Sequence, residues 1–303
     1  MFRKKINYIK IFLISMFLIP QLDAYKFIAM GDPHAGDGRK PFYCDFMLEK
    51  KIEYPEIDMI LFPGDLTSYN RIISSTSGTW GEEQVVITNH SQWRILYDSW
   101  ISPLEAVGIE SFLAMGNHDG YNYMENNYNI PEAIRVVDML KYHYFDFDHV
   151  FTESDYAYAF KKVNTYFICC GMQPDNQILT WLESYLRDVV KTSPAIIFLH
   201  YAVCGKKGNK WWRYDFYNTI KDYNIRGILH GHFQSFTWLW NDNIPIFSCG
   251  GMFFTIVDCD LSTGVIDLEK TKFYGTYTGE GTDFVEKGFF DPDLYGQFEN
   301  APY

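Results

Sequence analysis

Metal-binding side chains follow five separate apolar runs of this sequence. Every run ends in a turn, and carboxylate, amide or imidazole groups come directly after it. They are Asp32 and His34 in "GDPH", Asp65 in "PGDL", Asn117, His118 and Asp119 in "GNHD", His200 after "AIIFL", and His230 and His232 in "ILHGHF". Carboxylates and imidazoles together bind zinc, manganese or iron. One such motif often occurs by chance, whereas five in order indicate a metal site.

The chemistry of this site depends on what single side chains can do. One aspartate able to bridge would hold two ions about 3.5–4 Å apart, the spacing that clamps an in-line displacement at phosphorus. The side-chain oxygen of Asn117 is a neutral ligand, and it leaves the adjacent His118 free to transfer protons. The histidines outside the five motifs lie in polar stretches and are interpreted as surface groups: His90, His143 and His149.

The apolar runs are the elements that must position these groups. Their length and their β-branched or aromatic content are typical of buried strands. They span residues 25–30, 57–62, 109–115, 195–199 and 225–229. Helical patterns lie at 93–107, 131–142 and 175–190, the last with Asp175 as its N-cap. Strands alternating with helices predict a layered α/β fold, and hairpin-like runs from Tyr156 onward predict a second, mostly antiparallel sheet.

Taken in order, the motifs resemble those of the calcineurin-like metallophosphoesterases. That family's pattern runs Asp-x-His, Gly-Asp, Gly-Asn-His-Asp or Glu, a lone His, and then Gly-His-x-His. The resemblance covers Asp32 to about Gln234, and "GNHD" is its most specific piece. It implies a four-layer α/β/β/α sandwich of two mixed sheets flanked by helices. It also implies a dinuclear centre of transition-metal ions, Fe, Mn or Zn, at the strand ends.

The resemblance implies a role for each motif residue. The first ion would be held by Asp32, His34 and Asp65. The second would be held by Asp65, Asn117, His200 and His232, with Asp65 bridging. A metal-bound hydroxide would attack phosphorus in a phosphate mono- or diester. His118 would protonate the leaving alcohol as general acid, and Asp119 would orient its ring.

The last motif departs from the family pattern. "GHFQ" places Gln234 where the family has its final histidine, so Gln234 would be an oxygen ligand to the first ion or only a water anchor. Aligning on His230 instead keeps two histidines but loses the glycine before them. We prefer the first alignment because it keeps Gly231 in the turn. His230 would then lie in the second shell, face the leaving group, or be an ordinary strand-end histidine.

Two long segments that leave from strand ends could wall the active site. One lies between Asp65 and Asn117, and the other follows His200 as "YAVCGKKGNKWWRYDF". The second contains cations that could attract phosphate and tryptophans that could stack on a base, sugar or aromatic leaving group. These are Lys206, Lys207, Lys210, Arg213, Trp211 and Trp212. The alternative is a solvated basic loop with the tryptophans packed beneath it.

Composition limits the partners. Hydrophobic residues make up 47% and aromatic residues 18% of the 303 residues, enough for a large core and incompatible with a disordered chain. The formal net charge of -12 repels polyanions, so nucleic acid is not the expected partner and a nuclease is disfavoured. A small phosphate ester is the expected substrate.

The N-terminus predicts export. Residues 1–24 have a basic start, an apolar stretch from Ile11 to Pro20, and Ala24 before the expected cut, as in a signal peptide. An uncleaved anchor is the alternative, although the apolar part is short for a membrane span. The mature chain is then secreted, periplasmic or lumenal, without stable membrane insertion. We expect one domain over 25–274, a C-terminal extension over 275–303, and one or two disulfides among the six cysteines.

Two functions remain open at this point. The first is an exported, metal-dependent phosphoesterase. The second is a metal-binding scaffold on the same fold that has lost catalysis. Retention of His118 favours the enzyme because binding alone needs no general acid, whereas Gln234 is the feature that favours the scaffold.

Overall fold

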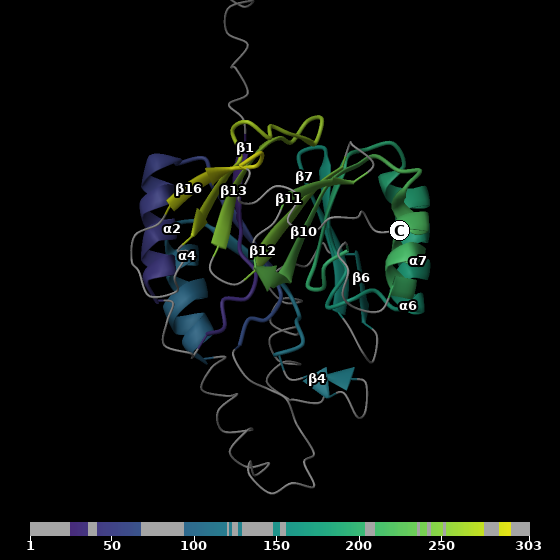
Figure 1. Cartoon of the computed structure of the whole chain (residues 1–303), viewed down its shortest axis with the longest axis horizontal. Coiled ribbons are helices and arrows are strands. Elements are labelled where there is room, and N and C mark those ends of the chain that lie inside the picture. Colours follow the sequence, from purple (N-terminus) through teal and green to yellow (C-terminus); the bar gives the residue numbers. More distant parts are fainter. Residues whose placement is uncertain are drawn as a thin grey trace, which may run out of the picture.

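Two mixed β-sheets face each other at the centre of the structure, with helices on both outer faces (Figure 1). The computed structural model describes residues 25–35, 41–67, 94–119, 121–122, 127–128, 148–151, 156–203, 210–234, 237–240, 244–250, 253–275 and 285–291. The predicted α/β/β/α sandwich is therefore confirmed. Residues 1–24 and the predicted helix at 131–142 lie outside the described residues.

The first sheet has the strand order β16-β15-β13-β1-β2-β3. Its strands are β1 (Tyr25–Ala29), β2 (Met59–Pro63), β3 (Glu110–Ala114), β13 (Phe253–Asp260), β15 (Lys272–Gly275) and β16 (Val285–Gly288), and β14 (Val265–Ile266) pairs with β13. β1, β2 and β3 run parallel, with Ile28 opposite Ile60 and Met59 opposite Glu110. Their carboxyl ends therefore meet at one edge.

The second sheet has the order β11-β12-β10-β9-β8-β7-β6. Its strands are β6 (Asp148–Phe151), β7 (Tyr156–Lys162), β8 (Thr165–Cys169), β9 (Ala195–Leu199), β10 (Ile225–Gln234), β11 (Thr237–Trp240) and β12 (Ile244–Gly250). The four central strands β8, β9, β10 and β12 run parallel to one another. The outer strands β6, β7 and β11 pair antiparallel with their neighbours. A separate small hairpin joins β4 (Tyr121–Asn122) and β5 (Asn127–Tyr128).

Alternating side chains of each strand serve two cores. In β1, Phe27 and Ala29 pack between the sheets, whereas Ile28 faces the helices. Aromatic rings join the sheets: the Phe27 and Phe167 ring centroids are 5.6 Å apart. Each fully buried apolar side chain contributes about 1.5–3 kcal/mol relative to exposure. Burial on both faces explains why these strands read as continuous apolar runs.

Helices cover the outer faces. On the first sheet lie α2 (Pro41–Glu53), the π-helical turn η1 (Tyr97–Ile101) and α4 (Ser102–Ala106). On the second lie α6 (Asn176–Tyr185), η2 (Leu186–Val190) and α7 (Lys210–Ile220). The predicted N-cap of α6 is confirmed, because the Asp175 carboxylate accepts a hydrogen bond of 2.8 Å from the Ile178 amide. None of the helices described here combines the length and apolarity needed to cross a bilayer.

Part of the segment interpreted as a loop after His200 is a helix. Residues 210–220 form α7, which packs on the second sheet. Its buried positions Arg213, Phe216 and Ile220 are three and four residues apart, as on one face of a helix. The pattern was hidden because an arginine occupies the first of these apolar-face positions.

The first sheet extends beyond the domain boundary expected at 274. β16 pairs antiparallel with β15, Tyr274 lying opposite Glu286, and Phe289 is fully buried in the core between the sheets. The described residues 285–291 thus contribute to the folded domain. The expected disulfides are not formed among the described cysteines, which are buried thiols: Cys44, Cys169, Cys170, Cys249 and Cys259.

Candidate metal centre

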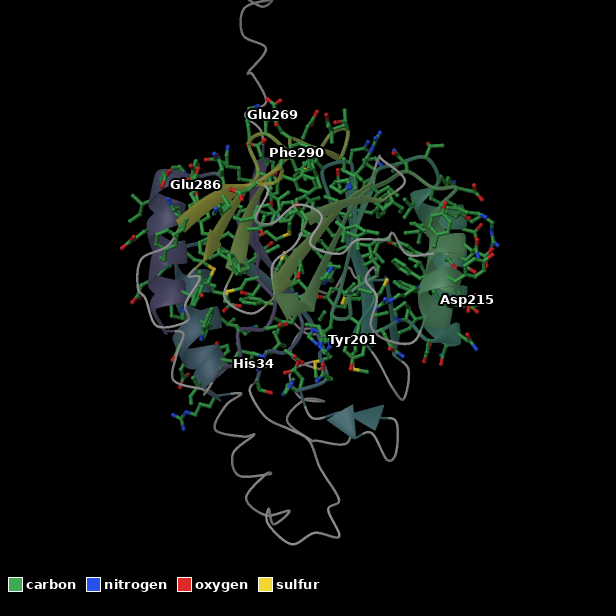
Figure 2. All side chains as sticks on the ribbon, in the orientation of Figure 1. His34, Tyr201, Asp215, Glu269, Glu286 and Phe290 are labelled. Carbon is green, nitrogen blue, oxygen red and sulfur yellow. The ribbon has the colours of Figure 1, made fainter. Side chains whose placement is uncertain are left out.

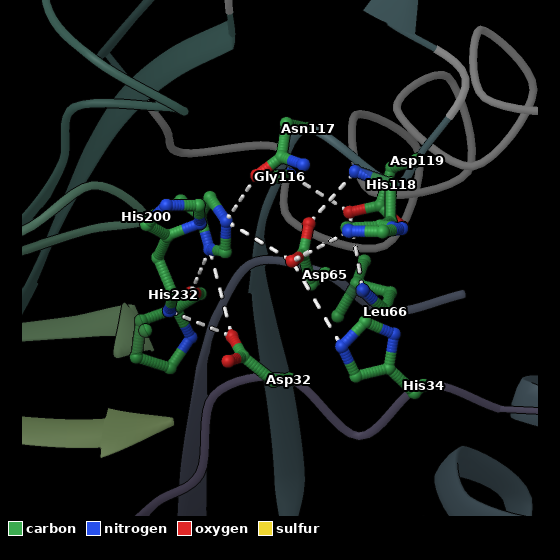
Figure 3. Close-up of polar contacts among 12 residues, drawn as sticks. Asp32, His34, Asp65, Leu66, Gly116, Asn117, His118, Asp119, His200 and His232 are labelled. Carbon is green, nitrogen blue, oxygen red and sulfur yellow. Dashed lines mark hydrogen bonds and ion pairs between the residues drawn. The ribbon is translucent and has the colours of Figure 1, made fainter. Parts of the chain in front are cut away.

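The motif residues converge where the parallel strands end. Figure 3 shows Asp65 at the centre of the group, between His200 on one side and His34 on the other. Figure 2 places His34 and Tyr201 at the same end of the molecule, opposite the end that carries Glu269 and Phe290. Side chains from both sheets meet here, as expected for a site at the carboxyl ends of strands.

Two groups of three ligand side chains share Asp65. Asp32, His34 and Asp65 form one group, which we call the first ion position. Asp65, His200 and His232 form the other, the second ion position, and within each group the ligand atoms lie within 4.8 Å of one another. Nitrogen and oxygen donors at this separation fit Zn, Mn or Fe. The arrangement also fits the bridging role expected for Asp65.

Two of the ligand histidines, His200 and His34, are oriented by backbone carbonyls. His200 Nδ1 donates to Pro63 O at 3.0 Å, and His34 Nδ1 donates to Thr67 O at 3.1 Å. In both rings Nε2 therefore faces Asp65 Oδ2, at 3.2 Å from His200 and 3.9 Å from His34. A carbonyl behind the ring fixes the tautomer that leaves Nε2 available for a metal.

Asn117 lies next to the second ion position. Its side-chain oxygen lies 3.0 Å from His200 Nε2, which also faces Asp65. Burial lowers the pKa of His200, but the charges of Asp65 and Asp32 outweigh it and raise this pKa to about 9. A ring nitrogen held between two oxygen acceptors occupies the place of a cation. Metal binding there would displace the proton.

The electrostatics of Asp65 follow from three surrounding imidazoles. Burial alone would raise the pKa of Asp65, but the charges of His200, His118 and His34 hold it below its usual range. The carboxylate is therefore ionised even though Asp65 is only 2% exposed. Burial and the charge of His200 lower the pKa of His232 to about 4, which leaves its partly exposed ring neutral and able to bind a metal.

The backbone at the strand ends is left-handed at four candidate ligands. The φ angles are 53° at Asp32, 44° at His34, 51° at Asp65 and 68° at His232. Such angles are uncommon outside glycine and cost of order 1–3 kcal/mol each. Only two other non-glycine residues with positive φ occur in the described part of the chain, Val163 and Lys191. The strain is concentrated where it turns ligand side chains toward Asp65.

Two glycines let the strands approach closely enough. Gly64 has φ +80°, and a Cβ there would lie 2.6 Å from the ring of His200. A Cβ on Gly231 would lie 2.3 Å from Pro63 O and 2.5 Å from Asp32 Oδ1. No larger residue fits at Gly231 without moving the backbone. This close approach explains the glycine that precedes His232 and supports the alignment on "GHFQ".

His118 lies beside the two ion positions without belonging to either group. Its Nε2 is 3.9 Å from Asp65 Oδ2, and its side chain is 29% exposed. Its backbone amide donates to Asp65 Oδ1 at 2.8 Å, and the Thr67 hydroxyl donates to its carbonyl at 3.0 Å. The main chain is thus fixed independently of the ring. A solvent-facing imidazole next to the shared carboxylate is suited to proton transfer.

The carboxylate of Asp119, which was expected to orient the His118 ring, is held by backbone amides. It is fully buried and accepts hydrogen bonds from the amides of Gly116 (2.7 Å), Leu66 (3.1 Å) and Thr67 (2.8 Å). The Thr67 hydroxyl lies 3.1 Å from Oδ1. Burial, together with the charge of Asp65, raises the pKa of Asp119 to about 7 against the effect of the amides. Asp119 therefore ties the turn after β2 to the turn after β3.

Asp119→Asn is expected to destabilise the fold and lower the metal content. An amide nitrogen in place of Oδ2 would face the amides of Leu66 and Gly116, leaving two buried donors without an acceptor. The expected loss is about 2 to 6 kcal/mol in the free energy of unfolding. Denaturant unfolding and elemental analysis would measure both effects.

Asp175→Asn is the matched control. Asp175 also accepts a backbone amide hydrogen bond, but it is a helix N-cap, where asparagine serves about as well. Its unfolding free energy should stay close to that of the parent. Equal stability of Asp119→Asn and Asp175→Asn would show that the turns do not depend on the Asp119 carboxylate.

The two uncertain residues of the last motif separate in the structure. His230 is fully buried within β10, where its Nδ1 donates to Gly231 O at 2.8 Å, and burial lowers its pKa to about 3. It belongs to neither ion position, so it is a neutral strand residue behind the site. The backbone of Gln234 ends β10 opposite Gly250, and its side chain lies outside the described part of the structure.

The expected substrate residues are only partly described. Lys206 and Lys207, and the side chains of Lys210, Trp211 and Trp212, lie outside the described residues. Arg213 is 5% exposed, so it is not part of a solvated basic loop. Its charge contributes to the lowered pKa values of His230 and His232, so it lies near the second ion position.

Two functional residues were missed because they act through their main chain. Pro63 and Thr67 supply the carbonyls that orient His200 and His34. A carbonyl contributes no side-chain signal, although the position of both residues next to Asp65 suggests where to look. Tyr201 was also missed; its only signal in the sequence is that it follows His200.

Comparison with known proteins is consistent with this geometry. The sequence pattern of the calcineurin-like phosphoesterases matches residues 25–236. A solved structure described as GAP50, the anchor in the inner membrane complex of Plasmodium, is similar with a TM-score of 0.51 and 15% identity, over 89% of this chain and 90% of that chain. A purple acid phosphatase from seeds of yellow lupin, Lupinus luteus, gives 0.48 and 11%, over 80% and 52%.

The Plasmodium likeness, at its low identity, shows a shared fold. No curated protein matches the sequence. The family pattern covers more than half of the chain, including all five motifs, and the structure brings the motif residues into two groups around Asp65. This protein belongs to the calcineurin-like phosphoesterase family.

Proposed function

We propose that this protein is an exported, metal-dependent hydrolase of small phosphate mono- or diesters, with His118 as the general acid. The observation that carries the proposal is the pair of ligand groups sharing Asp65, with the His118 ring on their exposed side. The metal-binding residues are Asp32, His34, Asp65, Asn117, His200 and His232. They suit a family of metal-dependent phosphoesterases.

Two ions bound here would supply Lewis-acid activation of the phosphoryl group and of water. The chain's own residues prepare the site for this charge. Asp65 stays ionised at the centre, and the carbonyls of Pro63 and Thr67 keep the Nε2 atoms of His200 and His34 directed toward it. His118 Nε2 lies 3.9 Å from Asp65 Oδ2 and its side chain is 29% exposed, so the leaving oxygen of an ester bound at the ions could reach it.

An activity screen tests this proposal. The mature chain, reconstituted with Mn, Zn or Fe, should be assayed with phosphate monoesters, phosphodiesters and cyclic phosphate esters. We expect hydrolysis of at least one class that requires metal and stops when a chelator removes it. If the metal-loaded protein hydrolyses none of these ester classes, the proposal that it is an enzyme is refuted.

A non-catalytic scaffold is the alternative, and Gln234 is the residue that favours it. The Plasmodium structure on this fold is described as an anchor, and a fold alone does not decide between anchoring and catalysis. On this alternative the ions bind and no ester is hydrolysed. The screen above separates the two functions directly.

Gln234→His is expected to tighten the first ion position. A neutral amide oxygen is a weaker ligand for these metals than imidazole, so in the parent the first ion should exchange with a chelator faster than the second. The substitution should slow that exchange and leave the second ion unchanged. Chelator competition followed by elemental analysis measures this; equal resistance at both positions, unaltered by the substitution, would count against the alignment on Gly231.

Export is supported by the order of basic and apolar residues before Ala24. N-terminal sequencing of the protein from its natural host should begin near Tyr25. A cytosolic protein that still begins at Met1 would refute this part of the proposal.

A further inference from the structure

Tyr201 contacts both histidines of the second ion position. Its ring centroid lies 4.5 Å from that of His232, edge-on at 76°, and 5.4 Å from that of His200, tilted by 36°. The His200 and His232 rings are themselves 5.1 Å apart. The three rings therefore form one cluster, defined here as the ring cluster. A single tyrosine joins a ligand from β9 to a ligand from β10.

The backbone of Tyr201 is fixed by hydrogen bonds to the segment that follows β8. Its amide donates to Met172 O at 2.8 Å, and the amide of His200 donates to Gly171 O at 2.9 Å. The side chain is partly buried and packs against the hydrophobic core between the first sheet and its helices. Tyr201 is thus a rigid support, and it lies at the same end of the molecule as His34 (Figure 2).

His232 lies at an irregular part of its strand. It is partly exposed, its φ is 68°, and the pairing of β10 with β12 shifts register between His230 and Gln234. Its amide donates to Asp32 Oδ1 at 2.9 Å, which fixes the backbone. Its ring contacts the rings of Tyr201 and His200. The ring of His200, by contrast, is held by the carbonyl of Pro63.

We propose that Tyr201 is a positioning residue for the second ion position, and that its ring, through the contact with His232, holds that imidazole in the orientation that binds metal. The inference rests on the metal site of the proposed function. It does not require that any ester be hydrolysed, because it concerns ion binding alone.

The interaction free energy of an aromatic pair of this kind corresponds to a change of about 2- to 10-fold in an equilibrium constant. Removing the ring should weaken the second ion by that factor and leave the first unchanged. Removing only the hydroxyl should have no such effect, since the contacts to both histidines are between rings.

Co²⁺ titration followed by visible absorption tests this. The titration is done in a His34→Asn background, because His34 belongs only to the first ion position and its loss leaves the second to report. Tyr201→Leu should bind Co²⁺ about 2- to 10-fold more weakly and with a changed absorption spectrum. Tyr201→Phe should match the parent in both affinity and spectrum.

Tyr214→Leu is the control, since this tyrosine is 57% exposed on α7 and should change neither affinity nor spectrum. If Tyr201→Leu is unfolded by circular dichroism, Tyr201→Met serves the same comparison. The inference is overturned if loss of the ring leaves Co²⁺ binding unchanged, if Tyr201→Phe is weakened equally, or if the parent binds no metal. A protein that binds two ions but hydrolyses no ester would refute the proposed function and leave this inference standing.

Discussion

Asp65→Asn is expected to weaken metal binding at both ion positions by more than the roughly 10–100-fold that loss of an outer-shell partner costs. Asp65 is the one residue common to the two ligand groups. Its Oδ1 accepts the amide of His118 at 2.8 Å, while Oδ2 faces His200 and His34. One carboxylate oxygen therefore accepts the backbone hydrogen bond, and the other faces the ion positions.

Asparagine cannot perform the two tasks together. If its oxygen accepts from the His118 amide, its nitrogen points at the ions and cannot bind them. If its oxygen points at the ions, its nitrogen opposes the His118 amide, and a buried donor loses its acceptor. The substitution also removes the negative charge that lies among three imidazoles.

Elemental analysis after reconstitution with Mn, Zn or Fe measures the result. The parent should hold close to two ions per chain, as expected for a dinuclear site. His34→Asn is the matched control, since His34 belongs to one group and should cost only the first ion. Loss of a single ion from Asp65→Asn would show that Asp65 does not bridge.

His118→Asn is expected to slow hydrolysis of alkyl phosphate esters by about 10²–10⁴-fold. In an in-line displacement the leaving oxygen departs opposite the nucleophile, and an alkoxide leaves poorly unless it is protonated. The His118 ring is partly exposed, close to Asp65, and attached to a backbone held by Asp65 and Thr67. The fold and both ions should therefore survive the substitution.

The leaving group supplies the internal control. Nitrophenyl phosphates have an acidic leaving oxygen that needs little help from a proton, so their hydrolysis should fall much less. The measurement is the ratio of kcat/KM for the two ester types in parent and variant, at equal metal content. Parent-like rates for both esters would exclude His118 as the general acid.

The ligand motifs and the strands before them could be predicted from sequence because their signals are local. A strand buried on both faces reads as a continuous apolar run, and a turn with polar groups follows it within a few residues. β1, β2, β3 and β9 accordingly lie where the apolar runs predict them. β10 begins at the predicted residue, but it continues through the expected turn to Gln234. Parallel strands then bring their carboxyl ends together, so the grouping around Asp65 follows from order along the chain.

The role of Asp119 was decided only by the tertiary structure. The family resemblance implied that Asp119 orients the His118 ring. In the fold its carboxylate accepts amides of Leu66 and Thr67, which are 53 and 52 residues away along the chain. A buried carboxylate must accept hydrogen bonds from the donors that lie nearest to it in space. Here β2 and β3 are neighbouring parallel strands, and the turns that follow them place backbone amides next to Asp119.

Contacts between segments far apart in the sequence also decided the positions of Arg213, Phe289 and Tyr201. Arg213 is charged yet lies on the buried face of α7, and Phe289 lies beyond the expected domain boundary yet fills the core between the sheets. Tyr201 reads as an ordinary residue after His200, and becomes a neighbour of His232 only when β9 and β10 pair. Sequence determines which groups end each strand, because that information is local. Packing between distant segments determines what those groups touch.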